Sequence, residues 1–165
     1  MNFRICFALA LTLPIFANAE VVGKVASESR DAATAYVLTQ NFVIGRTARD
    51  CFPDLGRTDT PKDFVARWQN ANAKYFSAAI SYMNRRLAEA EALGGQKARN
   101  DVAVALDSAI NVDGTGAVND FFKRDVRHEV CKKVIGLMDS GAFNIDMRSP
   151  MYGELQALVQ YVEGQ

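Results

Sequence analysis

Apolar residues recur every three or four positions along most of the chain, which is the period of an α-helix. The longest such segment begins at Thr60, which can cap a helix, and at Pro61, which suits the first helical position. Gly94 and Gly95 end it. Its apolar stripe consists of Phe64, Trp68, Tyr75, Ala79, Tyr82, Met83, Leu87, Ala90 and Leu93. The pattern predicts one long helix over about 60–93.

The same period predicts four more helices, at about 31–47, 96–110, 118–138 and from Pro150 onward. The first of these is apolar around much of its circumference, which indicates burial against several neighbours. Asp113–Gly116 is expected to separate the helices at 96–110 and 118–138. Residues 143–148 alternate between apolar and polar, which predicts a short extended segment. No repeat or linker divides the chain. We therefore expect an all-α fold, a single helical bundle of about five helices over residues 20–165.

The first nineteen residues have the pattern of a secretory signal peptide. Arg4 precedes an apolar run over residues 5–16, and Ala17 and Ala19 form a small-x-small cleavage site. The apolar run is shorter than the roughly 20 residues that a membrane-spanning helix needs. We therefore expect cleavage after Ala19, no stable membrane insertion, and a periplasmic or secreted protein.

Two cysteines remain after the predicted signal peptide, Cys51 and Cys131. An even number of cysteines in an exported protein indicates a disulfide. A redox or metal role is the alternative, but the chain has no Cys-x-x-Cys motif and His128 is its single histidine. The sequence predicts one structural disulfide, no metal site and no cofactor.

Charge and motifs narrow the classes of function. Lys plus Arg and Asp plus Glu both number 19, so no overall positive field favours a nucleic acid. The chain lacks a Gly-x-Ser-x-Gly motif, and one histidine gives little basis for a nucleophilic site. We expect no catalytic residues, and therefore not an enzyme.

Two polar residues interrupt the apolar stripe of the predicted long helix, Asn72 and Arg86. A buried amide or guanidinium is costly unless it is hydrogen-bonded, so both side chains need partners. In a structural interpretation, Asn72 binds the backbone of a neighbouring loop, and Arg86 either extends its charged end to solvent or pairs with a carboxylate of another helix. In a functional interpretation, a cleft or binding surface is lined by Trp68, Asn72, Tyr75, Tyr82 and Arg86.

These observations favour an exported protein-binding module, such as an inhibitor, an immunity protein or an envelope adaptor, with a protein partner in the envelope. The alternative is a helical bundle that binds a small ligand in the cleft lined by aromatic residues, Asn72 and Arg86. A homodimer through the long helix, with Tyr75 and Tyr82 in the contact, is a further hypothesis.

Overall fold

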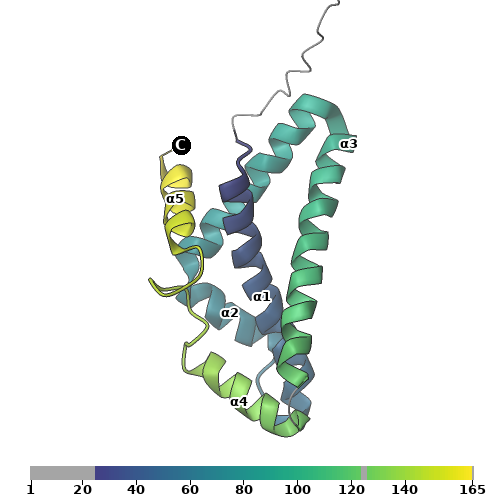
Figure 1. Ribbon diagram of the computed structural model, residues 1–165, viewed down its shortest axis with the longest axis vertical. Helices are drawn as coiled ribbons and strands as arrows, with labels where there is room; N and C mark the ends of the chain where they lie inside the picture. Colours follow the sequence, from purple (N-terminus) through teal and green to yellow (C-terminus); the bar gives the residue numbers. More distant parts are fainter. Residues whose placement is uncertain (1–24, 124–125, 165) are drawn as a thin grey trace, which may run out of the picture.

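Five α-helices form the described part of the chain (Figure 1). The structure is a computed structural model, and it describes residues 25–123 and 126–164. The helices are α1 (Glu28–Leu55), α2 (Pro61–Ala71), α3 (Ala73–Phe122), α4 (Arg127–Asp139) and α5 (Tyr152–Glu163). The prediction of an all-α bundle with one long helix and one disulfide is confirmed. The predicted signal peptide lies outside the described residues.

The long helix lies at 73–122 rather than at about 60–93, and it is a hairpin of two arms. Its backbone leaves the helical conformation at Gly94 (φ −140°) and Gly95 (φ 67°, ψ −167°). The conformation of Gly95 is one that glycine alone adopts readily, and Figure 1 shows the chain reversing direction at this bend. We call residues 73–93 the first arm and residues 96–122 the second arm.

The predicted boundary at residue 60 is correct as a helix start, but that helix ends after Ala71. The Thr60 side chain accepts a hydrogen bond from the Asp63 N–H (3.1 Å), as expected for a capping residue. Asn72 then interrupts the helix with φ −115° and ψ 25°. Its side-chain Oδ1 accepts a hydrogen bond from the distant Ile145 N–H, and a short amide side chain that bonds to backbone groups in this way favours a helix boundary.

Three other predicted boundaries are wrong. Helix α1 continues to Leu55 rather than ending near residue 47. The second arm continues through Gly114 and Gly116, where the sequence indicated a break, and the next helix starts at Arg127 rather than near residue 118. Gly114 is buried against Phe42 of α1, and a Cβ atom on Gly114 would lie 2.3 Å from Phe42 Cδ1. This glycine therefore permits close packing of two helices. The predicted extended segment at 143–148 is a series of turns between α4 and α5, and no strand occurs among the described residues.

Helix α1 is the centre of the bundle, because it contacts all four of the other helices. Its buried side chains include Val37, Val43, Ile44 and Phe52, which occur on several sides of the helix. This burial matches the apolar circumference seen in the sequence. Figure 1 shows α1 between the second arm of α3 and α5, so both lie against the central helix.

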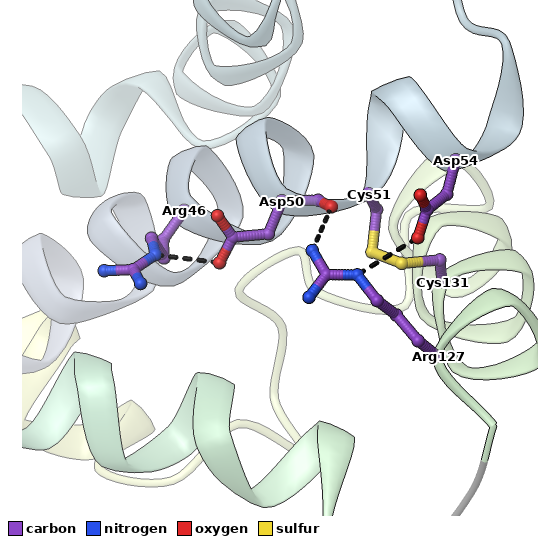
Figure 2. The surroundings of a disulfide bond; sticks show 6 residues. All are labelled: Arg46, Asp50, Cys51, Asp54, Arg127 and Cys131. Atoms are coloured by element: carbon purple, nitrogen blue, oxygen red, sulfur yellow. Dashed lines mark hydrogen bonds and ion pairs between the residues drawn. A yellow bond between two sulfur atoms is a disulfide. The ribbon is translucent and has the colours of Figure 1, made fainter.

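The disulfide joins the last turns of α1 to α4, and both Cys51 and Cys131 are fully buried. Arg127, at the start of α4, strengthens the same junction (Figure 2). Its Nε donates to Asp54 Oδ2 (3.0 Å) and its Nη2 donates to the Asp50 carbonyl (2.6 Å). A covalent bond and an ion pair therefore hold the two helices together at one place.

Candidate functional site

The five residues predicted to line one cleft lie in two separate environments. Trp68, Asn72 and Tyr75 bind the connection between α4 and α5, or α5 itself. Tyr82 and Arg86, farther along the first arm, face α1 instead. The first group is bound to a loop and to α5, whereas the second forms the polar end of a cavity.

Asn72 is the centre of the first environment and is only 2% exposed. Its Nδ2 donates to the Trp68 carbonyl (2.8 Å) and to Asn144 Oδ1 (3.1 Å). Its Oδ1 accepts a hydrogen bond from the Ile145 N–H (2.7 Å). These are the bonds that the structural interpretation requires, because they tie the helix boundary to the backbone of a distant loop.

The two aromatic residues beside Asn72 are also engaged within the chain. Trp68 Nε1 donates to the Phe143 carbonyl (2.9 Å), and the Tyr75 hydroxyl accepts from Gln156 Nε2 of α5 (2.9 Å). Trp68 and Tyr75 are both buried. An open hollow of about 710 Å³ borders this cluster and is lined by Asn72, Tyr75 and residues 145–148, but the indole of Trp68 does not line it.

The second environment is a cavity of about 280 Å³ between α1 and the two arms of α3, which we call the hairpin cavity. Its polar end is formed by Asp31 and Thr34 of α1 with Tyr82 and Arg86 of the first arm. The remaining lining is apolar and comes from Ala35 of α1 and from both arms of α3, with Leu106 in the second arm. Apolar walls around a few polar groups are typical of small-ligand sites.

The carboxylates at the polar end of the cavity accept hydrogen bonds from groups other than Arg86. The Tyr82 hydroxyl donates to Asp31 Oδ1 (2.6 Å), and burial followed by this hydrogen bond raises the pKa of Tyr82. Glu89 accepts hydrogen bonds from the Val25 N–H (2.8 Å) and the Ala26 N–H (3.1 Å). Arg86 lies farther from both carboxylates, with Nε 3.7 Å from Asp31 Oδ1 and Nη1 3.8 Å from Glu89 Oε2.

Arg86 makes no hydrogen bond to any described residue, although its side chain is only 24% exposed. Its Nε is buried without a hydrogen-bond partner in the described structure, and so is Oγ1 of Thr34. A carboxylate of another helix was one of the two structural alternatives for Arg86, and Asp31 of α1 provides one at ion-pair distance. The sequence did not identify Asp31 and Thr34 as site residues. Asp31 lies in the first turn of α1, where an acidic residue is expected to interact with the helix dipole, and the local pattern gives no sign of its contact with Tyr82, 51 residues away.

The outer side of the second arm is a further exposed feature. Val104 is 68% exposed and Val112 is 67% exposed, and Ser108 lies between them at helical spacing. Between residues 91 and 113 no residue is buried. The buried residues of the second arm are Gly114 and Val118, near its end.

Other kinds of site find no support among the residues that the structure describes. No group of three or more histidine, cysteine, aspartate or glutamate residues in residues 25–123 and 126–164 is placed to hold a metal ion. Within the same ranges no helix has the length and hydropathy needed to cross a membrane. No known protein family, curated protein or solved structure matches the chain.

Proposed function

We propose that the protein is an exported protein-binding module that packs a helix of a partner protein against the outer side of the second arm. The observation that carries the proposal is the lack of any buried residue over 91–113. A helical segment of this length in a small bundle usually buries an apolar side, and here the large side chains Val104 and Val112 remain about two-thirds exposed.

The spacing of the exposed residues suits a helical partner. Val104, Ser108 and Val112 are four residues apart, so they form one ridge along the helix. Such ridges fit into the grooves of a second helix, and the small side chain of Ser108 lets the partner approach closely at the middle of the ridge. Covering two valines contributes on the order of 3 kcal/mol, which is enough to change affinity about a hundredfold.

The experiment places a photo-cross-linking amino acid at position 108 of the full chain in its native host. The expected result is an adduct with a helical segment of one partner, identified by mass spectrometry. The purified partner is then titrated against the wild-type protein and against the Val104→Asp, Val112→Asp double variant. We expect the double variant to bind about a hundredfold more weakly.

Leu137→Asp is the matched control, because Leu137 is an exposed apolar residue (43%) on α4, away from the ridge. Equal affinities of the double variant and the wild type would contradict the proposed surface. An adduct between two copies of the chain would contradict a separate partner and would support the homodimer. Because Tyr75 and Tyr82 are buried within the chain, neither tyrosine provides a surface for that dimer.

A further inference from the structure

The guanidinium of Arg86 is the least satisfied charged group at the hairpin cavity. It carries five N–H donors in one plane, and none of them donates a hydrogen bond to a described residue. Its two ion pairs, at 3.7 and 3.8 Å, exceed the usual length of a charged hydrogen bond, which is about 2.7–2.9 Å. Nε is the one nitrogen of this guanidinium that is buried without a partner in the described structure, and an unsatisfied buried donor is costly.

The neighbouring charged groups are already bound to other partners. Asp31 accepts from the Tyr82 hydroxyl, and Glu89 accepts from two backbone N–H groups at the start of α1. Arg30 donates to the Val25 carbonyl and lies 4.1 Å from the centre of the Tyr161 ring. Arg30 Nε is buried without a hydrogen-bond partner in the described structure, but Arg30 does not line the cavity. Among the charged residues that line it, Arg86 is therefore the one with hydrogen-bond donors left for a ligand.

The rest of the hairpin cavity is suited to a hydrocarbon group. Met83 and Leu87 of the first arm face Val102 and Leu106 of the second across about 280 Å³. This volume approaches the lower end of the range for small-molecule sites. An apolar chain in the cavity would cover these side chains, which are only partly buried in the described structure.

We propose that the hairpin cavity binds a small apolar monocarboxylate, with the ligand carboxylate on the Arg86 guanidinium and its hydrocarbon part between the two arms of α3. A carboxylate matches the planar fork of an arginine and can accept two parallel hydrogen bonds from it. The site lies on the inner side of the second arm, so it is independent of the outer ridge of the proposed protein-binding surface.

The test uses isothermal titration calorimetry of the full mature chain with two probes, octanoate and octanol, which share the hydrocarbon chain and differ in the head group. We expect octanoate to bind at least about tenfold more tightly than octanol, as one charged hydrogen bond implies. In Arg86→Met this preference should disappear while octanol binding remains. Arg86→Lys keeps the positive charge but lacks the planar guanidinium, and it should retain part of the preference for octanoate over octanol.

Two further variants make the result specific. Arg85→Met is the matched control, since Arg85 is the adjacent arginine and does not line the cavity; its preference for octanoate should be unchanged. The larger side chain in Leu106→Trp should fill the cavity and weaken the binding of both octanoate and octanol. Circular dichroism should confirm that this variant is folded. The proposal is overturned if neither probe binds, if both bind equally well to the wild type, or if Leu106→Trp leaves binding unchanged.

Discussion

Replacement of Asn72 by aspartate tests whether the buried amide holds the α2–α3 boundary to the distant loop. The two side chains have nearly the same shape, but aspartate places an oxygen where Nδ2 now donates to the Trp68 carbonyl (2.8 Å) and to Asn144 Oδ1 (3.1 Å). Two hydrogen bonds become oxygen–oxygen contacts, and a charge is buried at a site that is 2% exposed. An unpaired buried charge costs about 3–5 kcal/mol, which we take as the expected loss in the free energy of unfolding at neutral pH.

The cost should depend on pH in a defined direction. Burial disfavours the charged carboxylate, so the pKa of the introduced aspartate should be higher in the folded state than its unfolded value of about 3.9. The variant should therefore lose stability relative to the wild type as pH rises from about 4 toward the higher folded pKa. Below about pH 4 the protonated carboxyl can again donate to the Trp68 carbonyl, and the difference should shrink.

Urea unfolding followed by far-ultraviolet circular dichroism, at about pH 4 and about pH 7, measures both effects. Asn70→Asp is the control, because Asn70 is an exposed asparagine in the last turn of the same helix. Its cost should stay within about 0.5 kcal/mol at either pH. The reasoning is refuted if Asn72→Asp costs no more than Asn70→Asp, or if its cost increases on acidification.

The disulfide, the closely packed Gly114 and the buried Tyr82 should each have a measurable effect on stability. Replacing both cysteines of the disulfide, which closes 80 residues, should lower the free energy of unfolding by up to about 4.5 kcal/mol in urea titrations. Gly114→Ala should cost about 1–3 kcal/mol because its Cβ meets Phe42, whereas Gly116→Ala, with open space around it, should gain about 0.5–1 kcal/mol; equal melting-temperature shifts would contradict this. Because the pKa of Tyr82 is raised by burial and by Asp31, its stabilising effect is complete below about pH 10 and lost as pH rises through the folded value. Tyr82→Phe should therefore flatten the alkaline unfolding profile, and an unchanged profile would exclude this group as its cause.

The sequence predicted helix boundaries correctly where the contacts that determine them lie within a few residues in the chain. Thr60 and Pro61 start α2 as predicted, since capping involves residues within one turn. The helix boundary at Asn72 and the continuation of the helix through Gly114 were not predicted, because the partners of these residues are remote in the chain. The loop that binds Asn72 is 73 residues away, and Phe42, which requires glycine at position 114, belongs to another helix.

The sequence predicted that two polar residues need partners, but it did not predict which residues share a site. Polar residues in an apolar stripe correctly indicated that Asn72 and Arg86 require partners, and both have partners in distant elements. The predicted cleft, however, depended on one continuous helix over about 60–93, which would place all five residues in a common environment. The break at Asn72 divides these residues between two helices. The bend at Gly95 brings the second arm to the cavity that Arg86 lines, and the periodicity of a single helix cannot predict such a cavity between two arms.

The second arm is held mainly at its ends, and this distribution of contacts should be measurable. The bend fixes one end, Gly114 and Val118 are buried near the other, and residues 96–113 between them include no buried residue. Local opening requires little free energy where few apolar contacts are lost. Hydrogen exchange with mass spectrometry should therefore show faster exchange over 96–113 than over 73–93, which contains Tyr75 and Tyr82 in the core.

Octanoate in the hairpin cavity should slow exchange in 96–113 of the wild type and much less in Arg86→Met, because a bound molecule adds contacts on the arm's inner side. Equal exchange in both arms would refute the argument from burial, and equal protection in the variant would refute the role of Arg86.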